Sequence, residues 1–144
     1  MVNWEASYLE GEQAEIRLLP YIRDYFKKDI KRYDDRYSQY DYHDKDKSQY
    51  ELKDRSSSYS LNSFKEVMIT TNKLRDIELY LIFNFKDYLA YIKYDKKQFK
   101  DYKVAPFSRA ERREDEKDHT FIPVKDLTII QKWKKIPPKC LIEL

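Results

Sequence analysis

The chain has 144 residues, the length of about one domain, and contains a single glycine, Gly11. Phosphate-binding loops, dinucleotide fingerprints and nucleophile elbows each need several glycines, because their backbones turn sharply or approach a ligand closely. These patterns are therefore excluded. Most nucleotide-binding classes and many hydrolase classes are excluded with them.

Thiol and imidazole groups are also scarce. Cys140 is the only cysteine, and the two histidines, His43 and His119, lie far apart in the sequence. A Cys/His zinc site and a disulfide framework are both excluded. The first residues lack the basic and apolar segments of a secretory signal, so we expect an intracellular protein that is not secreted.

Long hydrophobic runs are absent as well. Hydrophobic residues make up 41% of the chain and charged residues 38%, and the mean hydropathy is −0.93, which argues against a membrane span. Aromatic residues are abundant at 16%, including 14 tyrosines, a density that is uncommon in disordered chains. The net charge of +3 is too small to indicate a polyanionic partner. We therefore expect one folded domain over residues 1–144.

The first predicted element is a helix over residues 11–28. Ala14, Leu18 and Ile22 follow one another at intervals of four, which is the spacing of one helical face. Pro20 lacks a backbone donor and clashes with the preceding turn, so we expect a kink or a break there, with a second helical segment starting at Pro20.

Residues 39–55 change to a period of two, which predicts a β-hairpin with a polar turn at 44–47. If residues 45–47 form a three-residue loop, Asp41 lies directly opposite Glu51. The core face of this hairpin is expected to carry Tyr40, Tyr42, Tyr50 and Leu52.

The remaining elements are predicted in the same way. A helix is expected from Ser60 or Ser63 to about Leu74, because Ser63 and Glu66 have the spacing of a capping box. A second hairpin should join the apolar runs at 79–85 and 88–94. After residue 95 the sequence signals for secondary structure are weaker. Besides the helix, the predicted elements are strands at 79–85 and 88–94, a short strand near 32–37, a helical turn at 98–102, a charge run at 109–118 and an extended stretch at 120–130.

The hairpin carries the pattern that points to chemistry. Its polar face combines Asp41, Glu51 and Lys53. Two carboxylates, with the backbone carbonyl of Leu52, are oxygen ligands of the kind that Mg²⁺ or Mn²⁺ accepts. Lys53 would orient or deprotonate an attacking water and steady the charge on a phosphate. From spacing alone, a salt-bridge ladder on a wet strand face explains the same three residues equally well.

Tyr40-Asp41 followed by Glu51-Leu52-Lys53 resembles the motif of the PD-(D/E)xK, restriction-endonuclease-like nucleases, with tyrosine in place of proline. Residues 11–15, followed by Leu18-Leu19, also resemble the first helix of archaeal Holliday-junction resolvases. That likeness implies that Glu15 is a third metal-binding acid, with Glu12 as its competitor on nearly the same helix face.

The resemblance implies a fold and an activity. The fold is a single α/β domain with an αβββαβ core over about residues 10–94, a mixed sheet flanked by helices, and a C-terminal extension over 95–144. The activity is hydrolysis of DNA phosphodiester bonds with Mg²⁺ or Mn²⁺. The implied partner is duplex or branched DNA, and a homodimer is the expected way to cut both strands or hold a junction.

Two further expectations complete this interpretation. Residues 121–127 look similar to the ends of uncharacterised members of this group in large DNA viruses, so the expected location is cytoplasmic or virus-associated. Four basic residues near the hairpin and helix are the candidates for nucleic-acid contacts, namely Lys73, Arg55, Lys28 and Lys31. A non-catalytic nucleic-acid-binding or assembly subunit, and a nuclease acting on RNA, stay open as alternatives.

Overall fold

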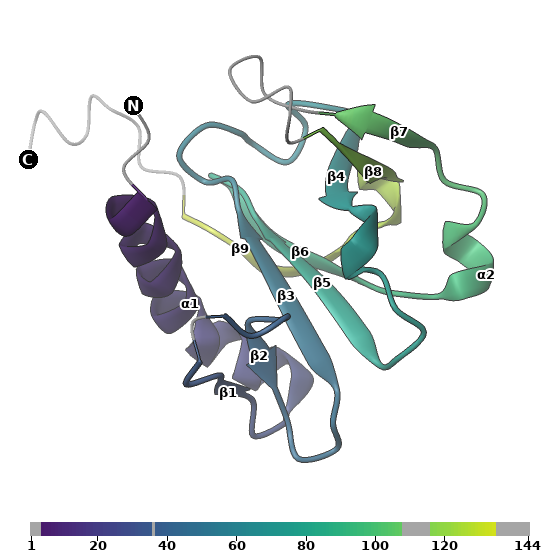
Figure 1. The fold of residues 1–144 in the computed structure, drawn as a ribbon. Helices are drawn as coiled ribbons and strands as arrows, with labels where there is room; N and C mark the ends of the chain where they lie inside the picture. The colour runs from purple at the N-terminus through teal and green to yellow at the C-terminus, as the bar shows by residue number, and fades with distance from the viewer. Residues whose placement is uncertain (1–3, 36, 108–115, 135–144) are drawn as a thin grey trace, which may run out of the picture.

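A six-stranded mixed sheet forms the centre of the computed structural model, which describes residues 4–35, 37–107 and 116–134 (Figure 1). β3 and β5 are parallel, and the other neighbouring strands are antiparallel. A parallel pair needs a crossover connection, which residues 55–78 supply. The strands in spatial order are β1 (Lys31–Arg32), β2 (Tyr42–His43), β3 (Gln49–Asp54), β5 (Leu79–Asn84), β6 (Tyr88–Lys93) and β9 (Thr128–Lys132).

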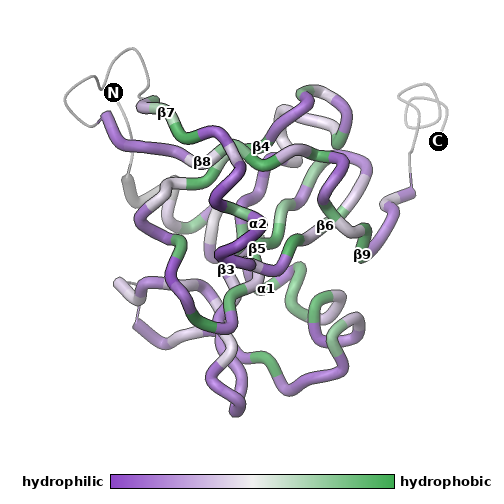
Figure 2. Tube along the Cα trace, turned by 90° about the vertical axis from the view of Figure 1, so that its right-hand side faces the viewer, coloured by the Kyte–Doolittle hydropathy of each residue, from purple (hydrophilic) through white to green (hydrophobic). Residues whose placement is uncertain are grey.

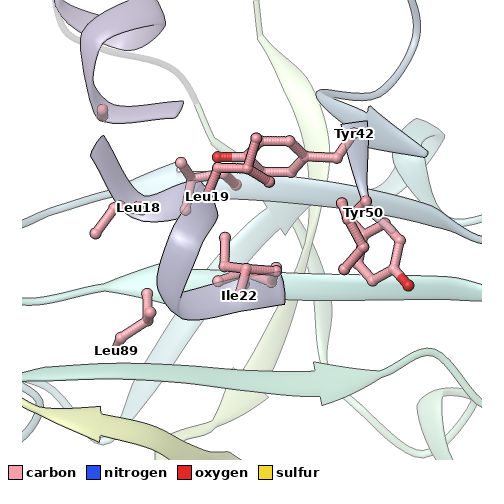
Figure 3. Packing of buried hydrophobic residues seen from close by; sticks show 10 residues of the cluster. Leu18, Leu19, Ile22, Tyr42, Tyr50 and Leu89 are labelled. Atoms are coloured by element: carbon pink, nitrogen blue, oxygen red, sulfur yellow. The ribbon is translucent and has the colours of Figure 1, made fainter. Parts of the chain in front are cut away.

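One face of this sheet is covered by the helix α1 (Trp4–Phe26). Ala14, Leu18 and Ile22, the predicted apolar stripe, lie on the buried side of α1. Figure 2 shows hydrophobic and hydrophilic residues alternating along this helix. Figure 3 shows Leu19 and Ile22 toward Tyr42 and Tyr50 of the sheet, with Leu18 on the side of Leu89. The helix prediction is therefore confirmed in type and face.

The predicted second helical segment at Pro20 is wrong, because α1 continues through this residue to Phe26. Pro20 lies on the exposed side of the helix, so its missing donor group costs one hydrogen bond without displacing core side chains. The residues on either side of it, Leu19 and Ile22, are buried against the sheet. Tertiary packing of this kind supplies most of a helix's stability in a protein.

The other face is covered by a second, three-stranded antiparallel sheet of β4 (Glu66–Thr70), β8 (Lys117–Pro123) and β7 (Val104–Phe107). The predicted helix over 60–74 is therefore wrong, since β4 and the 3₁₀ turn η1 (Thr71–Lys73) take its place. The mixed sheet is flanked by a helix on one face and a sheet on the other.

The physical reason is β-branching combined with a distant partner. β4 contains Val67, Ile69 and Thr70, whose branched side chains favour strands over helices. Ile69 pairs with Thr120 of β8 and is 1% exposed. The order αβββ is observed as predicted, and the second helix of the αβββαβ core is replaced by β4 and η1.

Both predicted hairpins are confirmed. Tyr42 lies opposite Tyr50, and the backbone N–H of Asp44 donates to the carbonyl of Ser48 at 3.2 Å, which leaves the three-residue loop that was predicted. The hairpin of β5 and β6 agrees with its predicted bounds to within a residue at each end. Tyr40 is an exception to the predicted core face. It packs in the opposite cluster, because the regular strand begins only at Tyr42.

The described part of residues 95–144 contributes to both sheets. The predicted helical turn at 98–102 is observed slightly earlier, as α2 (Lys96–Phe99) capped by the Asp95 side chain. The extended stretch at 120–130 is divided by a 3₁₀ turn, η3 (Val124–Asp126), into β8 and β9. The charge run predicted at 109–118 lies mostly outside the described residues. No helix in the described ranges is long and apolar enough to cross a membrane.

Candidate functional site

Asp41 is held beside β3 by two backbone hydrogen bonds. Its N–H donates to the carbonyl of Tyr50 at 3.0 Å, and its Oδ2 accepts from the N–H of Leu52 at 2.7 Å. The Asp41 carboxylate is therefore fixed by the backbone N–H of Leu52, the residue after Glu51. The hairpin register brings Asp41 and Glu51 together, as the three-residue loop predicted.

Glu51 lies on the face covered by the second sheet and is only 4% exposed. Its Oε2 is 3.3 Å from Nζ of Lys53, and its Oε1 is 3.6 Å from Nζ of Lys73. Oε1 is buried and has no hydrogen-bond partner among the described residues. The polar face of the hairpin is therefore not wet at this point, since the crossover that carries Lys73 covers it.

Glu15 joins the site from α1. Nε of Arg32 donates to its Oε1 at 3.3 Å, and the hydroxyl of Tyr42 donates to its backbone carbonyl at 2.8 Å. Glu12 is 3.9 Å from Nη2 of the same arginine. Of the two helix acids, Glu15 is the one that interacts with Asp41.

The charge of Asp41 affects the pKa of both glutamates. Burial raises the pKa of Glu51 to about 7, with the Asp41 charge adding to the effect and Lys53 and Lys73 opposing it. Burial also raises the pKa of Glu15 to about 7, where Asp41 again adds and Arg32 opposes. Burial and a neighbouring negative charge both disfavour the ionised form of a carboxyl group. An additional positive charge nearby would stabilise that ionised form.

The donor set suits a hard divalent cation, although its side chains do not yet converge on one point. Within the described ranges, no three Asp, Glu, His or Cys side chains are close enough together to hold a metal ion. Carboxylate and carbonyl oxygens are nonetheless the ligands that Mg²⁺ and Mn²⁺ prefer. Oε1 of Glu51 accepts no hydrogen bond from any described residue, and Nζ of Lys73 lies 3.6 Å from it. The residues that could hold such an ion are Asp41, Glu51, Glu15 and Leu52, the last through its backbone carbonyl.

The predicted nucleic-acid contacts separate into two groups. Lys73 lies in the site, against Glu51. Arg55 directly follows β3 and lines an apolar cavity. Lys28 and Lys31 form ion pairs elsewhere, with Asp46 at 3.3 Å and Asp29 at 3.8 Å.

Sequence reasoning missed Arg32 as a member of the site. Arg32 opposes Tyr42 in β1, and its side chain reaches across to the acids of α1. A two-residue strand has no periodicity, so no local signal could have identified this arginine.

Tyr40 has a role that the motif did not suggest. Its hydroxyl donates to the backbone carbonyl of Lys73 at 2.7 Å, and Nζ of Lys73 lies 5.7 Å from the centre of its ring. Lys73 also donates to the carbonyl of Gln39. Tyr40 thereby holds Lys73 next to Glu51.

Comparison with known proteins finds no family model, no curated protein and no solved structure that matches this chain. The functional argument therefore depends on the residues and their geometry. The central feature is Asp41, which interacts with Glu15 of α1 and with Glu51 of β3, beside the cations of Arg32, Lys53 and Lys73.

Proposed function

We propose that this chain is a metal-dependent DNA endonuclease that hydrolyses phosphodiester bonds. The observation that carries the proposal is that Asp41 interacts with both Glu15 and Glu51, while Nζ of Lys53 lies 3.3 Å from Oε2 of Glu51. The element order αβββ, with β3 parallel to the strand after the crossover, supports the same interpretation. Fold order alone would be only an analogy, so the argument depends on the site.

A surface salt-bridge ladder does not explain the burial of Glu51. Ladders on a wet strand face leave their carboxylates in solvent, where each pair contributes little. Glu51 is 4% exposed, and one of its oxygens lacks a hydrogen bond from any described residue. An unsatisfied buried acceptor costs roughly 1–3 kcal/mol. That cost is understandable where the oxygen serves a ligand.

In the proposed mechanism, Asp41, Glu51 and Glu15, with the Leu52 carbonyl, would hold Mg²⁺ or Mn²⁺. The bound ion supplies charge neutralisation at the phosphate and a water of lowered pKa. Nζ of Lys53 holds the attacking water or a non-bridging phosphate oxygen. The ion pair with Glu51 fixes the position of the Lys53 side chain. Lys73, held by Tyr40, places a second positive charge against the same phosphate.

The proposed partner is DNA, duplex or branched, met in a cytoplasmic or virus-associated setting. Two copies acting as a homodimer would bring two such sites to opposite strands. A single chain of this size would cut one strand at a time.

The test is cleavage of supercoiled plasmid and of a four-way junction with Mg²⁺, Mn²⁺ or EDTA. Lys53→Ala and Glu51→Ala should each lower the cleavage rate by roughly 100-fold or more, as expected for loss of a group that stabilises the transition state. Lys93→Ala is the matched control, because it breaks an exposed Lys–Glu pair, 2.8 Å from Glu78, outside the site. Full activity in either site variant would overturn the proposal.

A second candidate function is a non-catalytic nucleic-acid-binding subunit. It is favoured by the fact that Arg32, Lys53 and Lys73 already neutralise the acids. This candidate predicts DNA binding that weakens with salt and needs no metal. Absence of cutting with every metal, together with such binding, would support it over the nuclease.

A further inference from the structure

An apolar cavity of about 480 Å³ opens on the same face of the central sheet as Glu51 and Lys53. It lies between β5, the second sheet and the connection that follows β3. A volume of this size is in the range of pockets that bind small organic groups. Six aromatic residues line it: Tyr59, Phe64, Phe83, Phe85, Phe107 and Phe121.

The cavity lies next to the candidate site along β3 and β5. Lys53 is the register partner of Phe83, which lines the cavity. Side chains two residues apart on a strand share a face, so Glu51 and Lys53 lie on the same side of β3, and Arg55 directly follows the end of this strand. Arg55 is itself part of the lining, and its N–H donates to the carbonyl of Asn84 at 2.7 Å.

The lining divides into a buried floor and an exposed rim. Phe83 and Phe85 form the floor and are 1% and 3% exposed. Tyr59, Phe64 and Phe107 are 39%, 59% and 42% exposed, so part of each ring is accessible at the rim, although Tyr59 and Phe64 contact each other edge to face and Phe107 contacts His119 in the same way. The charged lining residues are Arg55, Lys65 and Glu66, which gives a net positive charge.

We propose that this cavity binds an unpaired nucleobase of the strand whose phosphate lies at Lys53. The inference rests on the proposed nuclease function and narrows its substrate to DNA with unpaired nucleotides, such as flaps, branches or single strands. Flat rings stack on aromatic side chains irrespective of sequence, and basic groups at the opening attract the adjoining phosphates. An apolar peptide would use the rings but not the row of cations that leads to the acids.

The experiment measures binding of a short single-stranded oligonucleotide that carries 2-aminopurine, in EDTA so that no strand is cut. Stacking of the probe base in the cavity should quench its fluorescence, and replacing that base by an abasic site should weaken binding roughly 10-fold, as stacking of one base predicts. Phe64→Ala should produce a similar weakening without loss of fold, because Phe64 is 59% exposed. Ile16→Ala is the matched control on α1, where Ile16 is 52% exposed.

Equal affinity for the intact and abasic strands, or unchanged quenching in both Phe64→Ala and Phe107→Ala, would overturn the inference. An apolar dye that binds in the cavity and is not displaced by saturating oligonucleotide would indicate an apolar partner, and would overturn it too. The two proposals fail separately. Cleavage without quenching removes the base pocket alone, whereas quenching without metal-dependent cleavage removes the nuclease and leaves a base-binding protein.

Discussion

The two faces of the central sheet treat their buried polar groups differently. On the face covered by α1, the Tyr42 hydroxyl donates to the Glu15 carbonyl, and the Tyr50 hydroxyl donates to Oδ2 of Asp44 at 2.7 Å. On the opposite face, Glu51 is buried with one oxygen that no described residue hydrogen-bonds. Satisfied polar groups stabilise a core, whereas an unsatisfied carboxylate oxygen destabilises it unless a ligand arrives.

The apolar core under α1 and the candidate site thus use different sides of β3. Tyr50 and Leu52 point into the α1 cluster, and Glu51 and Lys53 alternate to the other side. The period of two in β3 is what separates them. Substitutions in the core under α1 should therefore change folding, and substitutions at Glu51 or Lys53 should change the proposed function and its dependence on ions. Glu15 belongs with the second group, because α1 brings it to Asp41.

The largest expected effect on stability is on the α1 face. Ile22 is fully buried, so Ile22→Ala should lower the free energy of unfolding by roughly 2–5 kcal/mol through lost burial and a residual cavity. Chemical denaturation measures this change. The exposed Ile16→Ala should change it by less than about 0.5 kcal/mol, and an equally small effect at Ile22 would refute the assignment of this core.

Adding Mn²⁺ should stabilise the folded chain through the candidate site on the opposite face of the sheet. An ion that binds only the folded chain raises its stability by about 2.7 kcal/mol at 100 times the dissociation constant. We expect Mn²⁺ to raise the melting temperature of the wild type and to have little effect on Asp41→Ala, as read by thermal unfolding. Equal shifts in the two proteins would remove Asp41 from the ligand set.

The metal-free protein should lose stability as pH rises through the range of Glu51. Its pKa is about 7 in the folded chain against an ordinary value of 4.5. The folded state therefore binds more protons than the unfolded state between these values, and stability falls from about pH 4.5 to pH 7. Glu51→Gln should reduce this fall in the free energy of unfolding by roughly 1–2 kcal/mol. The part of the fall that remains should come from Glu15, whose pKa is also raised.

Denaturation in EDTA across this pH range tests the slope. Glu78→Gln is the control, because Glu78 is exposed and pairs with Lys93 at the surface. A wild-type stability that rises over the same interval would contradict the burial of a carboxyl group at position 51.

The smallest expected effect is at the contact between helix and sheet. Tyr42→Phe removes the donor to the Glu15 carbonyl and should lower the free energy of unfolding by about 1 kcal/mol. Because that bond positions the helix acid, metal-dependent stabilisation should weaken as well. A matched Tyr50→Phe variant loses a bond to Asp44 and should leave the metal response unchanged.

Much of the site could be predicted from local pattern. The loop of residues 45–47 sets the register of the hairpin, and the register sets Asp41 beside Glu51. The spacing of Ala14, Leu18 and Ile22 fixes which side of α1 meets the sheet, and so where Glu15 lies. Arg32 and the contact of Lys73 with Glu51 could not be predicted, because they depend on segments that meet only after folding.

Local pattern predicted the type and buried face of α1, the two hairpins and the proximity of Asp41 to Glu51, since periodicity and turn length act over a few neighbouring positions. It did not predict that α1 starts at Trp4 and continues through Pro20. Only the tertiary structure decided that residues 66–70 form a strand and that Glu51 is buried. Ile69 takes its partner, Thr120, from a strand far along the chain, and that pairing overrode a local capping pattern. The cover over Glu51 comes from the same crossover, so the burial of this carboxylate depends on long-range packing.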